Sequence, residues 1–434
     1  MYEYFGVAYY LSNLLQHSRW SRDRLLKHQN KNIHKIVDYA YRHVSFYHEK
    51  FKEYGINPDD VRTQEDLSKL PIIRRRELQE NANSIISDEF DVRRLAKVST
   101  SGSTGQPLFT YITRREDAFR KAKLLRANTI CGQRPRDRWV IITGPQHQAQ
   151  ALRLQKFLGV YAPIPVSVFD NLASQISKIE NLRPDVLDGY SNSLLLLAKE
   201  VEKKGDTQIK PKMIIGGAEL IDASSRRFIE NHFDAPFYDE YALVELERLA
   251  WQCEERAEYH IDADSVIMEF VDSNDEKVGP GETGEIVCTS LFNYAMPFIR
   301  YAVGDLGKPS QEERCCCGRA FPLMKVIEGR KDSLVFLPDG RVVPPLAIGW
   351  AMEFFKFYSS IYQYRVIQKR IDSFRVLIKK KDNGVDKKTM EVELENHLKK
   401  MLNLCHDDVR FEIEFVPEIP LEKTGKLRKV ISEL

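Results

Sequence analysis

Residues 99–105 combine five hydroxyl side chains with two glycines, a composition suited to holding phosphate groups. Glycine lets the backbone turn so that successive N–H groups face one anion, and the hydroxyls add donors at close range. A Walker loop would end in Gly-Lys-Ser/Thr and lead into a helix, whereas Gln106 and Pro107 follow here. Apolar residues on both sides predict that the loop connects two strands. A polar hairpin linker is the alternative that these residues leave open.

Two acidic residues further along the chain could hold other parts of a nucleotide. Glu245 follows an apolar, strand-like segment and offers oxygen ligands of the kind that Mg²⁺ prefers. Asp305 lies beside Gly304, where a carboxylate could accept hydrogen bonds from both hydroxyls of a ribose. Taken alone, each acid also has the simpler interpretation of an ordinary surface residue.

A lysine near the C-terminus lies in a short turn, Thr424-Gly425-Lys426, after a predicted strand. An ammonium group at the tip of such a turn can move toward a phosphate or carboxylate and offset developing negative charge. The alternative is a solvated basic tail.

Four further residues have the types and spacing of a metal site. Cys253 and His260 lie seven residues apart, and Cys315-Cys316-Cys317 follows about 55 residues later. Cys253, His260, Cys315 and Cys317 together supply three sulfurs and one nitrogen, the donor set of a closed structural zinc site, with Cys316 pointing away. Four protein ligands leave no open position, so the predicted role is structural. Buried thiols beside an exposed histidine are the alternative.

The composition excludes several classes of protein. The chain has 434 residues, enough for two or three domains, and its 65 basic residues nearly balance 63 acidic ones. The net charge of +2 argues against nucleic acid as a partner. No apolar run approaches the roughly 20 residues that span a bilayer, and the N-terminus lacks a signal-peptide pattern. Seven cysteines in a chain of this size favour a reducing, cytoplasmic location over a disulfide framework.

An α/β fold is expected to position these residues. Strand-like and helical segments alternate after about residue 95, which favours a largely parallel sheet. The predicted strands are 139–143, 160–168, 185–189 and 212–216, and the predicted helices are 172–181 and 194–204.

The pattern also predicts how the chain divides. The large N-terminal domain, residues 1–329, would consist of a helical leader (1–94), an α/β core (95–265) and a β-rich subdomain (266–329). A small α+β domain, residues 330–434, would follow, with strands at 362–369, 374–380 and 409–416 and a helix at 388–402.

The order of the motifs resembles that of the adenylate-forming ligases, in particular the phenylacetate–CoA ligase branch and its relatives encoded with capsular polysaccharide genes. The resemblance runs from about Ile33 to the C-terminus and is far more specific than any one motif. Its motifs are the loop at 100–105, Gly216-Gly217-Ala218-Glu219, Tyr241 to Glu245, Tyr301 to Asp305, Gly329 to Asp332, and Thr424-Gly425-Lys426. The Cys…His…Cys-x-Cys-Gly-Arg arrangement is also similar to that of this branch.

The resemblance implies a role for each motif. The loop would wrap the phosphates of ATP, Tyr241 would flank adenine, Asp332 would lie at the hinge of a mobile C-terminal lid, and Lys426 would approach the carboxylate and the α-phosphate. The implied catalytic residues are Thr104, Glu245 (through Mg²⁺) and Lys426. The implied nucleotide-binding residues are Thr100, Ser101, Gly102, Ser103, Thr104, Gly105, Gly217, Ala218, Glu219, Tyr241, Asp305 and Arg330.

The implied activity is ATP-dependent activation of a carboxylic acid as an acyl-adenylate, followed by transfer of the acyl group. ATP, Mg²⁺ and structural Zn²⁺ would be the cofactors. The acceptor is left open between CoA and an amine or hydroxyl, for example one linked to a sugar in surface polysaccharide assembly, and so is the oligomeric state. Gln106, Ala242 and Val303 depart from the family pattern. An inactive nucleotide-binding scaffold of the same fold, and a phosphotransferase that would release ADP, are the alternatives.

Overall fold

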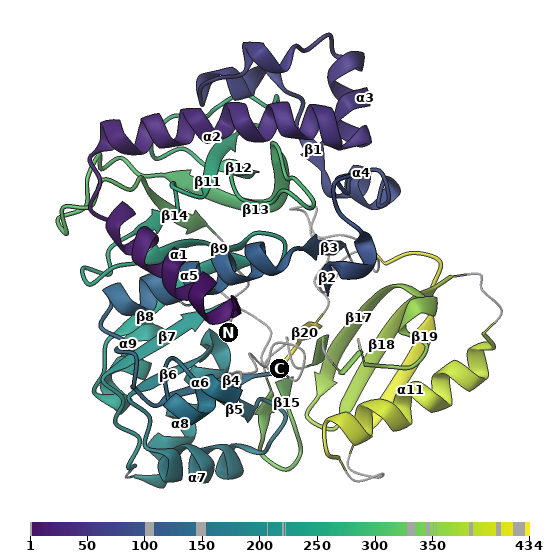
Figure 1. The fold of residues 1–434 in the computed structure, drawn as a ribbon. Coiled ribbons are helices and arrows are strands. Elements are labelled where there is room, and N and C mark those ends of the chain that lie inside the picture. Colours follow the sequence, from purple (N-terminus) through teal and green to yellow (C-terminus); the bar gives the residue numbers. More distant parts are fainter. Residues whose placement is uncertain are drawn as a thin grey trace. The chain divides into compact units, whose positions relative to one another are not determined.

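The computed structural model divides into two compact units (Figure 1). The first unit comprises the described parts of residues 1–100, 108–133 and 238–328, and the second those of 134–237 and 329–434. The structure describes residues 2–99, 108–144, 153–205, 207–218, 221, 223–327, 335–343, 348–349, 351–352, 354–381, 385–404, 409–419 and 430–434.

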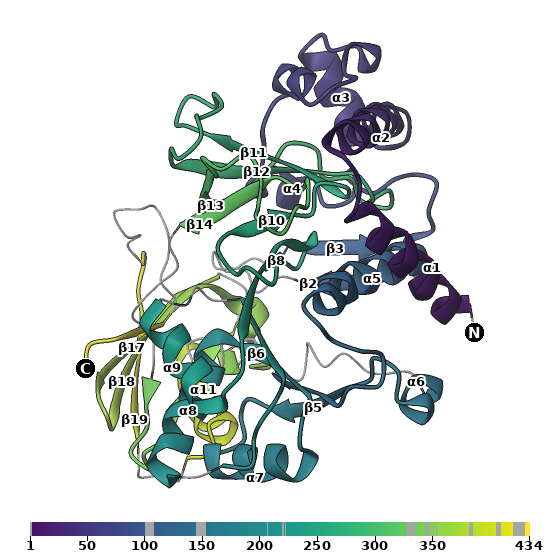
Figure 2. The same cartoon turned by 90° about the vertical axis from the view of Figure 1, so that its left-hand side faces the viewer.

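Helices open the first unit. Helix α2 has its buried residues at helical spacing, among them Ile33, Ile36, Val37 and Ala40, and Ser21 caps its N-terminus. Helix α1 lies along α5, as both views show (Figures 1 and 2). The helices are α1 (Tyr2–His17), α2 (Arg22–His43), α3 (Ser45–Glu53), α4 (Arg75–Glu80) and α5 (Arg114–Ile130), with short 3₁₀ turns at Pro58–Asp60, Glu65–Lys69 and Val92–Arg94.

A sheet of antiparallel neighbours forms most of the rest of the first unit, in the order β11-β12-β13-β14-β10-β9-β8. Strand β1 (Ile73–Arg74) adds to β13 in parallel. The other strands are β8 (Phe237–Leu243), β9 (Glu247–Gln252), β10 (Tyr259–Ile261), β11 (Val266–Val271), β12 (Gly284–Ser290), β13 (Tyr301–Pro309) and β14 (Leu323–Ile327). Strands β8 and β13 therefore belong to one rigid framework and carry residues far apart in the sequence.

The strands predicted around the phosphate loop are confirmed. Strands β2 (Ala96–Ser99) and β3 (Phe109–Ile112) pair antiparallel, with Ser99 opposite Phe109. The loop thus connects two paired strands, and residues 100–107 themselves lie outside the described residues.

The second unit contains the predicted parallel sheet, in the order β7-β6-β4-β5. Parallel neighbours require crossover connections, and helices supply them. The strands are β4 (Trp139–Thr143), β5 (Pro163–Ser167), β6 (Val186–Tyr190) and β7 (Met213–Gly217), and the helices are α6 (Arg153–Leu158), α7 (Leu172–Leu182), α8 (Ser191–Lys204) and α9 (Ala223–Phe233). The α/β fold class is confirmed.

A separate C-terminal domain is also confirmed, while its predicted boundary at residue 330 stays a prediction. Its sheet has the order β19-β18-β17-β20, and α11 buries Met390, Leu394 and Leu398 in a core of its own. The elements are β15 (Val335–Phe336), β16 (Val342–Val343), a 3₁₀ turn (Tyr358–Ser360), β17 (Ile361–Arg370), β18 (Ser373–Lys380), α11 (Lys387–Met401), β19 (Arg410–Phe415) and β20 (Val430–Ser432). Among the residues that the structure describes, no helix has the length and apolar character to cross a membrane.

Candidate functional site

Two of the residues predicted to hold a nucleotide contact each other in the first unit. The hydroxyl of Tyr241, on β8, donates a hydrogen bond to Oδ2 of Asp305, on β13, at 2.8 Å. Burial and the neighbouring carboxylate raise the pKa of Tyr241 well above its usual value, so its phenol keeps the proton that it donates. The structure thereby joins two motifs that are 64 residues apart in the sequence.

Glu245 is a buried residue, and its interpretation as an ordinary surface acid is wrong. Its exposed fraction is 3%, and its Oε1 accepts hydrogen bonds from Nη1 of Arg75 at 3.0 Å and from the hydroxyl of Tyr301 at 3.2 Å. Burial and then the Glu245 carboxylate raise the pKa of Tyr301, so this phenol is also a proton donor. A buried carboxylate needs such partners, because burying an isolated charge is costly.

Helix α5 fixes the backbone on either side of Glu245. Arg120 donates from Nη2 to the carbonyl oxygen of Val244 at 2.7 Å and from Nη1 to that of Glu245 at 3.1 Å. Lys123, one turn further along α5, donates to the carbonyl oxygen of Leu246 at 3.3 Å. Sequence reasoning missed Arg75, Arg120 and Lys123, since no local pattern marks a basic side chain whose partner lies more than 100 residues away.

The Glu245 carboxylate fits the role predicted for it toward Mg²⁺. Oε1 accepts both of these hydrogen bonds. Neither bond uses Oε2, which is therefore the oxygen that could bind a cation. Protein Mg²⁺ sites commonly use one or two carboxylates and take their other ligands from phosphates and water. A single well-held carboxylate is therefore a sufficient protein contribution.

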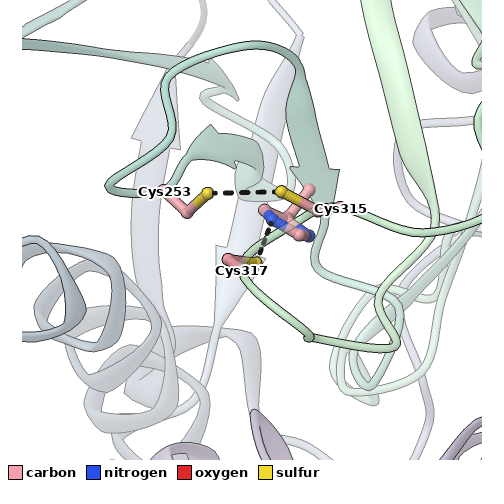
Figure 3. Close-up of side chains that lie close together, drawn as sticks. Cys253, Cys315 and Cys317 are labelled. Atoms are coloured by element: carbon pink, nitrogen blue, oxygen red, sulfur yellow. Dashed lines mark hydrogen bonds between the residues drawn. The ribbon is translucent and has the colours of Figure 1, made fainter.

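The four residues of the predicted zinc site come together, and Figure 3 labels the three cysteines among them. Their ligand atoms all lie within 4.8 Å of one another; Sγ of Cys253 is 3.7 Å from Sγ of Cys315, and Sγ of Cys317 is 3.3 Å from Nε2 of His260. A tetrahedral ion with zinc–sulfur bonds of about 2.3 Å would place two sulfurs about 3.8 Å apart. The donor set and its spacing therefore fit zinc.

The paired strands explain how this cluster forms. Cys253 directly follows β9, His260 lies on β10, and Cys315 and Cys317 lie in the connection between β13 and β14. His260 is fully buried, so the alternative with an exposed histidine is wrong, whereas Cys316 is exposed. Burial, with Arg319 nearby, lowers the pKa of His260 to about 4, which keeps the imidazole in its neutral, ligating form.

The predicted residues Gly217 and Ala218 belong to the second unit, at the end of β7. Ala218 has a φ of 65°, a left-handed conformation that is costly for a residue with a Cβ and that often marks a functional site. At Gly216 a Cβ would lie 2.0 Å from Cζ of Phe237, so only glycine fits there. The remaining predicted residues, Thr100, Ser101, Gly102, Ser103, Thr104, Gly105, Glu219, Arg330, Asp332 and Lys426, lie outside the described residues.

Comparisons with known proteins agree with this fold. A family model described as the CapK C-terminal domain matches residues 346–433. Phenylacetate-coenzyme A ligase of Thermus thermophilus is 27% identical over 333 residues, 74% of this chain and 74% of that protein. Protein CapK of Staphylococcus aureus is 23% identical over 428 residues, 94% of this chain and 90% of that protein.

The fold has counterparts among solved structures. The structure of 2-hydroxyisobutyryl-CoA ligase in complex with 2-HIB-AMP and CoA matches with a TM-score of 0.66 and 20% identity, and the match covers 96% of this chain and 91% of that one. An open conformation of the same ligase matches with a TM-score of 0.61. The chain is thus similar in sequence to phenylacetate–CoA ligases and to CapK, and it has the fold of the 2-hydroxyisobutyryl-CoA ligase structures.

Proposed function

We propose that the chain is an ATP-dependent ligase that activates a carboxylic acid as an acyl-adenylate, releases pyrophosphate and transfers the acyl group to an acceptor. One observation carries the proposal: the 2.8 Å hydrogen bond between Tyr241 and Asp305 connects two residues that were predicted to hold the same nucleotide. The relatives named as phenylacetate–CoA ligases, and the structural neighbour bound to an acyl-AMP, support the same reaction class.

The chemistry explains why the site needs charged groups. A carboxylate is a poor electrophile, and its attack on the α-phosphate of ATP brings two anions together. Asp305 would hold the ribose hydroxyls, with Tyr241 fixing the carboxylate that accepts them. Glu245 would bind the cation, and Mg²⁺ would supply the charge that neutralises the phosphates.

The residues outside the described parts complete this proposal. The loop from Thr100 to Gly105 would donate to the β- and γ-phosphates, and Thr104 and Lys426 would join Glu245 as catalytic residues. Glu219 and Arg330 would bind the adenylate. Removing a preorganised donor or cation from a transition state costs roughly 10²–10³ in rate, so Lys426→Ala is expected to lose adenylation while ATP binding survives.

The test is exchange of pyrophosphate into ATP, measured over a panel of carboxylic acids that includes phenylacetate and 2-hydroxyisobutyrate. We expect exchange that depends on one class of acid, with AMP as the nucleotide product of the full reaction. Release of ADP would instead indicate a phosphotransferase. No conversion of ATP with any acid would indicate an inactive scaffold.

The proposal has two versions, which differ in the acceptor of the acyl group. The acceptor is CoA in the first version, and an amine or hydroxyl, such as one on a sugar, in the second. The neighbour solved with CoA favours a thioester product, and the similarity to CapK leaves the second version open. Competition between CoA, amino sugars and amino acids for the acyl-adenylate separates them. Full turnover without any thiol would exclude the CoA version.

We also propose that Cys253, His260, Cys315 and Cys317 bind structural zinc, supported by the convergence of their ligand atoms within 4.8 Å. The ion would join β10 to the connection between β13 and β14. Strand β13 carries Asp305. Metal analysis of the purified protein is expected to give close to one zinc per chain. A preparation that is folded and nearly free of zinc would contradict the assignment.

A further inference from the structure

Helix α2 runs along the outside of the first unit (Figure 1) and carries a row of basic side chains on its exposed side. We call this row, Arg24, Lys27, Lys31 and Lys35, the basic ridge; all four residues are exposed. At about 100° per residue, these positions fall within an arc of roughly 80°, opposite the side that buries Ile33. With a rise of about 1.5 Å per residue, the basic ridge is about 17 Å long.

Side-chain contacts leave the basic ridge charged. In the part of the chain that the structure describes, the ion pairs of α2 are formed by His34, Arg42 and His43, and none is formed by a residue of the basic ridge. The guanidinium of Arg24 instead lies 4.6 Å from the centre of the Trp20 ring. A ring contact does not neutralise a cation, so its charge remains for an anionic partner.

The acids on α2 and on the turn packed against it have other roles. Oδ1 of Asp38 accepts a hydrogen bond from Nε of Arg42 at 2.8 Å. Oδ1 of Asp59 lies 3.3 Å from Nη2 of Arg62. Asp23 lies in the first turn of α2, where a carboxylate stabilises the positive end of the helix dipole.

Two further acids line a cavity together with Lys35, the last residue of the basic ridge. Oε1 of Glu116 accepts the backbone N–H of Ala295 at 2.9 Å. Oε1 of Glu89 lies 3.8 Å from Nε2 of His43. Both acids thus have partners outside the basic ridge.

Positive charge is concentrated in this part of the chain. Residues 19–37 contain six Lys or Arg and one Asp, a net charge of +5. The whole chain carries only +2, so the remainder has a net charge of −3. A protein with one positive side and a negative remainder is attracted to an anionic surface in one orientation.

The shape and chemistry of the basic ridge favour an extended anionic surface as the partner. The ridge is the convex side of a helix, and its neighbours on that side, His28, Asn32 and His34, are polar. Protein partners are normally held by buried apolar anchors, which these polar side chains do not supply. Nucleic-acid-binding domains are strongly basic as a whole, whereas this chain is nearly neutral. Clusters of about four or more Lys or Arg on an amphipathic helix fit anionic lipid headgroups, which require no pocket.

We propose that the basic ridge of α2 docks the protein on a lipid bilayer with anionic headgroups. Its four cations contact the headgroups, and α2 lies parallel to the bilayer surface without entering the apolar core. These residues are not among those assigned above to ATP, Mg²⁺ or zinc, so docking stands whether or not the proposed activity is confirmed.

Sedimentation of the full chain with lipid vesicles tests the proposal. Vesicles of phosphatidylcholine with about one third phosphatidylglycerol, an anionic lipid, are compared with vesicles of phosphatidylcholine alone. We expect saturable binding to the anionic vesicles only. Raising the salt from about 0.1 M to about 0.5 M NaCl should weaken this binding at least about tenfold, because salt screens exposed charges.

Matched variants locate the contact. The ridge variant, which combines Arg24→Gln, Lys27→Gln, Lys31→Gln and Lys35→Gln, should bind roughly 10²-fold or more weakly, since each cation near an anionic surface contributes about fivefold. The control variant removes the same charge at exposed positions elsewhere and should bind as the wild type does; it combines Lys199→Gln, Lys210→Gln, Lys388→Gln and Lys400→Gln. Thermal unfolding should be unchanged in both variants, because all the altered side chains are exposed.

Several results would overturn the proposal. They are equal weakening in the ridge and control variants, equal binding to anionic and neutral vesicles, and no binding to anionic vesicles. Tighter binding of a DNA or RNA duplex than of the vesicles, lost in the ridge variant, would assign the basic ridge to nucleic acid instead.

Discussion

The carboxylate site around Glu245 and the cysteine–histidine cluster lie on one sheet, but they differ in whether their ligand atoms already have partners in the protein. Oε1 of Glu245 accepts hydrogen bonds from Arg75 and Tyr301, so part of its charge is already balanced by the protein. The four atoms of the cluster instead face one another within 4.8 Å. A site that exchanges its cation with every substrate needs the first arrangement, and a site that keeps its ion needs the second.

The largest effect is expected at the cluster. Cys315→Ser should abolish stoichiometric zinc binding and lower the free energy of unfolding by roughly 3 kcal/mol or more, because zinc binding energy is folding energy. Metal analysis and urea denaturation measure the two effects. The exposed neighbour provides the control: Cys316→Ser should keep its zinc and its stability. Zinc retained by the Cys315 variant would exclude the assigned ligand set.

The second-largest effect is expected on the rate of catalysis, without loss of the fold. Glu245→Gln keeps the shape of the side chain and an acceptor for Tyr301 but removes the charge that would bind Mg²⁺. We expect pyrophosphate exchange to fall about 10²-fold or more with little change in stability. Glu255→Gln, an exposed acid on the same unit, should be unaffected. Exchange at the wild-type rate in the Glu245 variant would remove this residue from the site.

A smaller effect is expected at Tyr241 and Asp305, the pair proposed to hold the ribose. Tyr241→Phe deletes the hydroxyl that donates to Asp305, a hydrogen bond to a charged group worth about 1.5–3 kcal/mol. The KM for ATP should rise about tenfold or more, while the choice of acid stays the same. Tyr238→Phe, on the same strand, serves as the control. An unchanged KM would separate Tyr241 from nucleotide binding.

The smallest effect tests the balance of charge at Glu245. Arg75 competes with a cation for the carboxylate, so Arg75→Gln should lower the Mg²⁺ concentration at half-maximal exchange by about threefold, equivalent to less than ~1 kcal/mol for a partly exposed pair. Arg76→Gln changes the exposed neighbour and should have no effect. A higher Mg²⁺ requirement would show that Arg75 mainly orients Glu245.

The sequence predicted the regular elements well because their patterns are local. Strand β4 has the predicted bounds, and β6 and β7 are displaced by one residue. The short strands β9 and β10 were not predicted, although they position Cys253 and His260. Their identity as strands depends on pairing with each other and with β14, which no local pattern contains.

The sequence did not allow us to predict which charged residues are buried. Arg126 and Arg248 are fully buried and both bind Asp262, although arginine is a residue type that usually lies at the surface. Their partners are distant in sequence, so only the fold brings them together. Glu245 was misjudged as a possible surface acid for the same reason, and Arg75 could not be recognised as its partner.

In the proposed reaction, the chain adenylates a carboxylic acid at a site that contains Tyr241, Asp305 and Glu245. Acid-dependent exchange of labelled pyrophosphate into ATP, compared between the wild-type chain and Glu245→Gln, tests it most directly. We predict exchange that requires both Mg²⁺ and a carboxylic acid and that falls about 10²-fold in the variant. Exchange that needs no acid, or that is equal in the two proteins, would contradict the claim.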